Sequence, residues 1–132
     1  SYYLKQKTAY EIKTTLENNI EAIRLAFTLG KENRNATDKE REILSRYAGF
    51  GGQKCVLNPA ATLADRKYWT QSDLPLFPLV SELHSLIRNN SKNEAQYKIY
   101  FNSFLLPFTH PNRWYKLFQV HLLMPELPLF IY

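Results

Sequence analysis

The chain has 132 residues, of which 45% are hydrophobic, and a single cysteine. This length suits one domain, or one domain with an appendage, and one cysteine excludes both a disulfide framework and a Cys-rich zinc site. No apolar run approaches the roughly 18–20 residues of a membrane helix, and the first residues lack the apolar core of a signal peptide. We therefore expect a cytoplasmic chain with no membrane partner. The net charge of +5 is compatible with a nucleic-acid partner but does not require one.

The first long helix is predicted over residues 8–30. Thr8 and Glu11 have the spacing of a capping box, in which each side chain binds the backbone N–H of the other residue. An apolar stripe one helix face wide follows, formed by Leu16, Ile20, Ile23 and Phe27. Gly30 is the expected C-terminal cap, because glycine readily adopts a left-handed conformation.

A second helix is predicted after the polar stretch that follows Gly30. Thr37 and Glu40 form another capping box, and Asp38 lies where the helix dipole favours a negative charge. Three residues are expected to form the buried face: Ile43, Leu44 and Tyr47. Gly49 is expected to end this helix.

Residues 53–73 have the weakest pattern. The dipeptide Asn58-Pro59 predicts a turn, because the residue before proline avoids the helical region. Tyr68 and Trp69 are aromatic residues of the kind that bury a ring and keep a polar edge near a partner.

Two more helices are predicted before residue 103. The first is preceded by Ser72 or Asp73 and ends at Asn89-Asn90. Its apolar positions are Leu79, Val80, Leu83, Leu86 and Ile87. The second opens with a capping box formed by Ser91 and Glu94. Its expected apolar face consists of Ala95, Tyr97 and Ile99. The pattern indicates an all-α bundle of four to five helices over residues 8–103.

Proline divides the chain unevenly. The first 58 residues contain none, the rest contain all seven, and four of these lie after residue 103. Of the 29 residues from 104 to 132, seventeen are hydrophobic or aromatic, and no periodicity persists there beyond a short helical stretch expected around residues 112–123. Such a segment has to pack on the domain or on another copy of the chain. We therefore expect a helical unit over residues 1–103 and a hydrophobic, proline-containing C-terminal tail over residues 104–132.

The turn Gly49, Phe50, Gly51 and Gly52 has the glycine content of a phosphate-binding loop. However, no Gly-Lys-Ser/Thr follows it and no predicted strand precedes it, so neither the P-loop nor the dinucleotide fingerprint is met. The favoured interpretation is a tight packed turn after a helix, with the Phe50 side chain filling the space beneath the turn.

No group of residues predicts catalysis or a metal. His84, His110 and His121 are too scattered for a metal site, and each is expected at the surface or the edge of the core. Cys55 is expected to be a small buried hydrophobic residue. We therefore assign no catalytic, cofactor-binding or metal-binding residue to this chain.

Five basic residues surround the loop between the first two helices: Lys31, Arg34, Lys39, Arg41 and Arg46. These are the candidate contacts to a DNA backbone. Acidic residues are interleaved with them, which favours an ordinary solvated helix face instead. Both interpretations stay open at this point.

Two stretches of the sequence carry an ordered series of motifs. The first is NIEAIRLAFTLGKENRNATDKEREILSRYAGFGG, and the second is LPLFPLVSELHSLIRNNSKNEAQYKIYFNS. The residues that define the motifs are Asn19, Ile20, Ala22, Ile23, Ala36, Thr37, Tyr47 and the turn Gly49 to Gly52. In this order of motifs, over about residues 15–103, the sequence resembles the opening segment of a family of DNA methylase/helicase proteins from Bacteroides-type conjugative elements and phages.

This resemblance implies a helical lead-in to an adenine-specific DNA methyltransferase that uses S-adenosylmethionine. The family's cofactor and catalytic motifs follow the lead-in, and none is found in this chain. The chain is therefore expected to be a non-catalytic fragment, without a cofactor of its own, that packs on the missing methyltransferase domain and contacts DNA weakly.

The likeness stops at residue 104, where the family's Phe-Tyr-Thr-Pro cofactor segment is expected. One permitted set of codons for residues 104–125, read after its first two bases are dropped, gives LTAFYTPKPVVQALSGTLTDA. This reading contains the missing motif, so we hypothesise that residues 104–132 are an out-of-frame extension. The alternative is a self-contained helical interaction protein that forms homo-oligomers through its aromatic-rich tail.

Overall fold

The computed structural model describes residues 8–106, and within this range it contains four α-helices, three 3-10 helices and no strand. The α-helices are α1 (Ala9–Glu32), α2 (Asp38–Ser45), α3 (Phe77–Asn89) and α4 (Glu94–Leu105). The 3-10 helices are η1 (Lys54–Leu57), η2 (Leu63–Tyr68) and η3 (Leu74–Leu76). The fold is therefore the predicted all-α bundle. The helical stretch expected around residues 112–123 lies outside the described residues.

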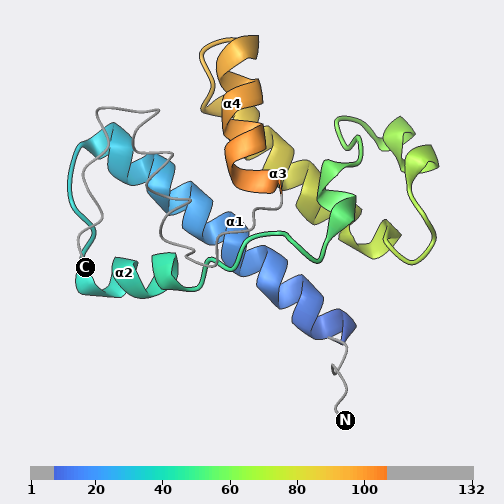
Figure 1. Cartoon of the computed structure of the whole chain (residues 1–132), viewed down its shortest axis with the longest axis horizontal. Helices are drawn as coiled ribbons and strands as arrows, with labels where there is room; N and C mark the ends of the chain where they lie inside the picture. Colours follow the sequence, from blue (N-terminus) through green and yellow to red (C-terminus); the bar gives the residue numbers. More distant parts are fainter. Residues whose placement is uncertain (1–7, 107–132) are drawn as a thin grey trace.

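Helix α1 is the centre of the bundle. It is the longest helix, with α2 folded back along one side and α3 and α4 on the other (Figure 1). The predicted capping box of Thr8 and Glu11 is present at its start, and all four residues of its predicted apolar stripe are buried. The sequence therefore predicted both the start of this helix and its buried face.

The predicted C-terminal cap of α1 is wrong. Gly30 lies inside the helix and is buried, and the helix ends at Glu32. Asn33 is the residue in the left-handed conformation, with φ 49° and ψ 53°, and its backbone N–H donates to the carbonyl oxygens of Gly30 and Leu29. Asparagine tolerates this conformation better than other residues with a side chain, so the helix continues past the glycine to reach it.

Helix α2 begins as predicted and ends earlier than predicted. Thr37 and Glu40 form the expected capping box. The helix stops at Ser45, four residues before Gly49, so Tyr47 lies beyond it in a segment without regular secondary structure. Tyr47 is nevertheless fully buried, because this segment runs back across α1. Leu44 is buried as expected, and Ile43 is half-buried.

The predicted details of the last two helices are only partly correct. Helix α3 has the expected end and apolar positions, but neither Ser72 nor Asp73 caps it with a side chain; it continues directly from η3. Helix α4 is capped by Asn93, whose side chain accepts from the backbone N–H of Gln96 at 2.9 Å. Ser91 instead donates to the carbonyl oxygen of Ile87.

The buried face of α4 differs from the predicted one. Ala95 and Ile99 are exposed, and the core is reached by Tyr100, Phe104 and Leu105. Both Tyr100 and Phe104 pack edge-on against Phe27 of α1, with ring centroids 5.5 and 5.8 Å apart. The buried core thus extends along α4 to Leu105, which is the second residue of the segment 104–132 whose composition differs from the rest of the chain.

Candidate functional site

The turn Gly49 to Gly52 is held against α1 by one buried side chain. The amide nitrogen of Asn19 donates to the carbonyl oxygen of Gly49 at 2.7 Å, and its Oδ1 accepts from the backbone N–H of Ala48 at 2.8 Å. Asn19 is the buried polar residue of the described core. Because buried amides require hydrogen-bond partners, this pair of bonds fixes where the turn begins.

The two aromatic residues of this segment fill the space beneath the turn. Phe50 is buried, as the packed-turn interpretation predicts, and packs edge-on against Tyr47 with ring centroids 6.2 Å apart. The Tyr47 hydroxyl donates to the carbonyl oxygen of Phe104 at 3.1 Å, and burial raises the pKa of Tyr47 well above its usual range. The turn is therefore anchored on α1 and on the end of α4.

The three glycines of the turn have different environments. Gly49 has φ 78°, a conformation that a side chain makes costly. Gly51 and Gly52 are exposed, have no positive φ, and a methyl group added to either would meet no atom within 4 Å. The fold of the described residues thus requires glycine at position 49 but not at positions 51 and 52.

A shallow hollow of about 540 Å³ lies beside these glycines. Its walls come from the first two turns of α1 and from the turn itself: Ile12, Thr15, Ala48, Gly49, Gly51, Gly52 and Gln53. The lining residues that the structure describes include no acidic side chain.

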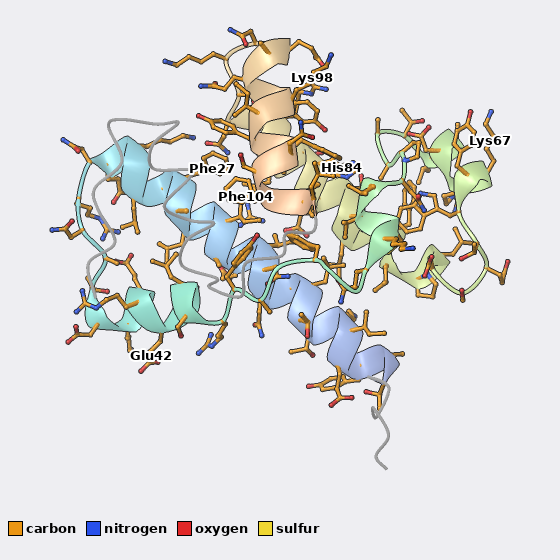
Figure 2. The ribbon with its side chains drawn as sticks, in the orientation of Figure 1. Phe27, Glu42, Lys67, His84, Lys98 and Phe104 are labelled. Carbon is orange, nitrogen blue, oxygen red and sulfur yellow. The ribbon has the colours of Figure 1, made fainter. Side chains whose placement is uncertain are left out.

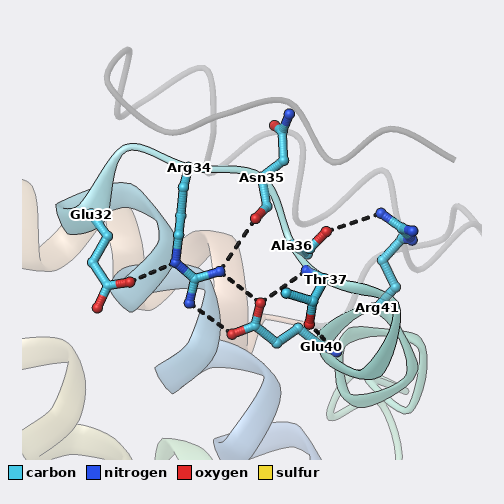
Figure 3. Close-up of polar contacts among 7 residues, drawn as sticks. All are labelled: Glu32, Arg34, Asn35, Ala36, Thr37, Glu40 and Arg41. Atoms are coloured by element: carbon cyan, nitrogen blue, oxygen red, sulfur yellow. Dashed lines mark hydrogen bonds and ion pairs between the residues drawn. The ribbon is translucent and has the colours of Figure 1, made fainter.

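The candidate DNA contacts divide into two groups. Arg34 is engaged within the chain: its guanidinium binds both carboxylate oxygens of Glu40 at 2.7 and 2.8 Å, Glu32 at 2.6 Å, and the carbonyl oxygen of Asn35 at 3.3 Å (Figure 3). These bonds lower the pKa of Glu40 to about 2 and raise that of Arg34. Arg34 therefore links the end of α1 to the start of α2 through its ion pairs with Glu32 and Glu40.

Arg41 is also engaged, by the carbonyl oxygen of Ala36 and the carboxylate of Asp38. Lys31, Lys39 and Arg46 are exposed and make no ion pair with any residue in the range 8–106. Three of the five predicted basic residues thus have no ion pair among residues 8–106: Lys31 on α1, Lys39 on α2, and Arg46 directly after α2.

A second groove, which the sequence did not predict, lies between the segment 57–65, α3 and α4. We call it the α4 groove; its volume is about 460 Å³. Its lining comprises Leu57, Asn58, Pro59, Ala60, Ala61, Asp65, His84, Ser85, Arg88, Asn89, Glu94, Tyr97, Lys98, Phe101 and Asn102. The segment 57–65 has no helical or strand periodicity, so the sequence offered no means of placing it beside α4.

His84 lies at the base of the α4 groove. Its Nε2 is 2.7 Å from the carbonyl oxygen of Val56, and its ring packs on Phe101 at a centroid distance of 5.2 Å. Burial lowers the pKa of His84, so the neutral ring is favoured. The expected place of this residue at the edge of the core is confirmed. His110 and His121 lie outside the described residues.

Trp69 fixes the outer wall of this groove. Its indole N–H donates to the carbonyl oxygen of Pro59 at 2.7 Å, and its ring packs edge-on against Phe77 at 5.3 Å. Tyr68 remains exposed. The prediction that these aromatics bury a ring and keep a polar edge near a partner is thus confirmed for Trp69 and wrong for Tyr68.

Cys55 is buried, as predicted, and burial raises the pKa of its thiol to about 11.

Within residues 8–106, no cluster of His, Cys, Asp or Glu could hold a metal ion. The helices of the same range include none that combines the length and the apolar character needed to cross a membrane. Comparisons with family models, curated proteins and solved structures gave no match to the chain.

Proposed function

We propose that the chain is a non-catalytic N-terminal helical module of an S-adenosylmethionine-dependent DNA adenine methyltransferase, and that it packs on the catalytic domain of this parent protein in the cytoplasm. The proposal rests on the ordered resemblance over about residues 15–103. It is supported by the way the resembling residues meet in space, since Asn19 of the first stretch binds the turn that begins at Gly49.

One observation carries the packing proposal: the fold does not need glycine at positions 51 and 52. Both are exposed, neither has a positive φ, and space is open around both. Glycine allows a neighbouring backbone to approach closely. The two glycines thus leave room for close packing of another backbone against the turn, and we infer that the hollow beside the turn receives the catalytic domain.

Contact with DNA is a second, weaker part of the proposal. Lys31, Lys39 and Arg46 are its candidates, because they carry exposed charge without an ion-pair partner among the described residues. Each phosphate contact of this kind steepens the salt dependence of duplex binding. No binding of a duplex at low salt would remove this part of the proposal.

The packing proposal is tested with the remainder of the parent, encoded beyond the Ser103 codon in the shifted reading frame. We expect this remainder to co-purify with the full chain in a one-to-one complex. Gly51→Gln fills the hollow without disturbing the fold and should abolish the complex, whereas the matched change Ala64→Gln, at an exposed position of η2, should leave it intact. A complex that survives Gly51→Gln contradicts the assignment of this surface.

The chain alone is expected to transfer no methyl group and to bind no S-adenosylmethionine. Methyl transfer to DNA by the purified chain would overturn the proposal. The alternative, a homo-oligomeric interaction protein, predicts a mass by light scattering that rises with protein concentration. A mass that stays monomeric at all concentrations argues against it.

A further inference from the structure

The α4 groove has an aromatic bank and no net charge. Tyr97 and Phe101 lie one turn apart on α4, are both half-buried, and have ring centroids 5.6 Å apart. His84 of α3 continues this surface, with its ring 5.2 Å from that of Phe101. The charged residues of the lining are two acids and two bases: Asp65, Glu94, Arg88 and Lys98. Such a groove suits an apolar segment that carries little charge.

Three of these four charged residues are engaged within the chain. Arg88 pairs with Glu94 at 2.8 Å, and its guanidinium covers the Tyr97 ring at 3.5 Å, so Phe101 is the central ring of the open surface. Asp65 accepts hydrogen bonds from two backbone N–H groups.

Lys98 is the charged residue of the lining that is left without a partner. It is exposed and makes no ion pair among residues 8–106. In Figure 2, Lys98 and His84 lie on the side of α4 that faces η2. The α4 bank can therefore pair with one acidic side chain of a segment that enters the groove.

The C-terminal tail of the chain contains a segment with these properties. Residues 107–132 lie outside the described range, but their sequence includes Pro125-Glu126-Leu127-Pro128, and Glu126 is the one acidic residue after position 103. Pro-x-x-Pro segments in the polyproline II conformation bind to aromatic-lined grooves. This helix has three residues per turn, so the two prolines would share a face about 9 Å apart.

The dimensions of the groove agree with this spacing. The α4 bank runs from Glu94 to Asn102, which is about 12 Å along a helix axis. Helix α4 ends at Leu105, so the groove begins one turn before the point at which the tail leaves it. The 18 residues from 107 to 124 span up to about 60 Å, which is more than the return to the groove requires.

We propose that the α4 groove binds the Pro125–Pro128 segment of the same chain, with the prolines against Phe101 and Glu126 paired with Lys98. This contact gives the hydrophobic tail the packing surface that its composition requires. A tethered segment reaches a local concentration on the order of 1 mM, which favours the tail of the same chain over that of a second copy in dilute solution. The proposal does not rest on the proposed function.

The first test is cross-linking of the full chain with a carbodiimide, which joins an amine directly to a carboxylate that it touches. We expect mass spectrometry to find Lys98 joined to Glu126 in the monomer band of a gel. Lys39, an exposed lysine on α2, is the matched control and should not be joined to Glu126. No Lys98–Glu126 link, or an equal yield with Lys39, would overturn the proposal.

The second test measures how fast chymotrypsin cleaves the tail of the full chain. Glu126→Lys and Lys98→Glu should each raise this rate about two- to fivefold, as expected for the loss of an exposed ion pair. The double variant restores the pair with its charges exchanged and should return the rate to within about twofold of the original. A double variant that is cleaved as fast as the faster single variant contradicts the pairing.

The prolines are tested in the same assay. Pro125→Ala combined with Pro128→Ala should raise the cleavage rate about fivefold, because alanine neither fills the groove as proline does nor favours the bound conformation in advance. The control Pro111→Ala removes a proline from the same tail and should leave the rate unchanged. Equal rates for the two changes would contradict the assignment of the segment. A Lys98–Glu126 link found in dimers alone would assign the groove to the tail of a second copy and overturn the proposal for the same chain.

Discussion

The side-chain amide of Asn19, fully buried on α1, donates a 2.7 Å hydrogen bond to the carbonyl oxygen of Gly49, thirty residues further along the chain. The same side chain accepts from Ala48. One residue thus joins the two conspicuous parts of the sequence, the long first helix and the glycine turn. It also explains why an asparagine lies among apolar positions of α1.

Replacement of Asn19 should destabilise the whole fold. Asn19→Leu fits an apolar core but leaves the Gly49 carbonyl and the Ala48 N–H without their partners, so we expect the free energy of unfolding to fall by about 2–3 kcal/mol. Urea denaturation measures this. The control Asn35→Ala changes an exposed side chain and should cost less than about 0.5 kcal/mol. A similar small loss for Asn19→Leu would show that the bridge is not important for stability.

The glycines of the turn should respond differently to alanine. Gly49→Ala introduces a side chain at φ 78° and should cost about 1–2 kcal/mol. Gly51→Ala and Gly52→Ala meet no neighbouring atom, so each should be neutral or stabilising by up to about 1 kcal/mol through the unfolded state. Thermal denaturation of the three variants compares them directly. A loss at position 51 or 52 as large as that at position 49 would mean that the isolated fold does need these glycines.

Tyr47 should make the protein sensitive to alkali. Burial raises the pKa of its hydroxyl above the value of about 10 found in an unfolded chain, so only the unfolded state releases this proton readily. The contribution to stability is therefore complete below pH 10 and is lost as pH rises above it. Tyr47→Phe should cost about 1 kcal/mol near neutral pH and flatten the decline above pH 10. An unchanged alkaline decline in this variant would assign it to other groups.

The end of α4 should be necessary for stability. Phe104 and Leu105 are buried, and the Phe104 carbonyl accepts from Tyr47. A chain that ends at Ser103 loses both side chains and should be less stable than one that ends at Leu106 by at least about 3 kcal/mol. Equal unfolding midpoints in urea for the two truncated chains would contradict the assignment of these residues to the core.

Local patterns determined which parts of the fold were predictable. The capping boxes at Thr8 and Thr37 were found because each depends on residues three positions apart, and the α1 stripe because its period is regular. The sequence predicts Gly30 as the cap because glycine is the commonest residue at that position. The correct choice depended on where the buried face of α1 ends, which is a tertiary property.

Helix α4 shows where local patterns are insufficient. Both Ser91–Glu94 and Asn93–Gln96 have the spacing of a cap, and apolar residues occur on most sides of the helix, so neither its start nor its buried face is defined by its own sequence. Packing against Phe27 selects Tyr100 and Phe104. The α4 groove could not be predicted for the same reason, because the segment 57–65 that forms its outer wall has no helical or strand periodicity. Of the predicted basic residues, only the structure distinguishes Arg34 and Arg41, which are paired, from Lys31, Lys39 and Arg46.

The central claim is that this chain is the opening module of a DNA adenine methyltransferase whose reading frame changes after Ser103. The most direct test is the nucleotide sequence that encodes residues 104–132. The claim predicts that dropping two bases after the Ser103 codon yields Leu-Thr-Ala-Phe-Tyr-Thr-Pro, followed by an open frame with the cofactor and catalytic motifs of the family. A shifted frame that lacks the Phe-Tyr-Thr-Pro segment, or that soon meets a stop codon, would contradict it.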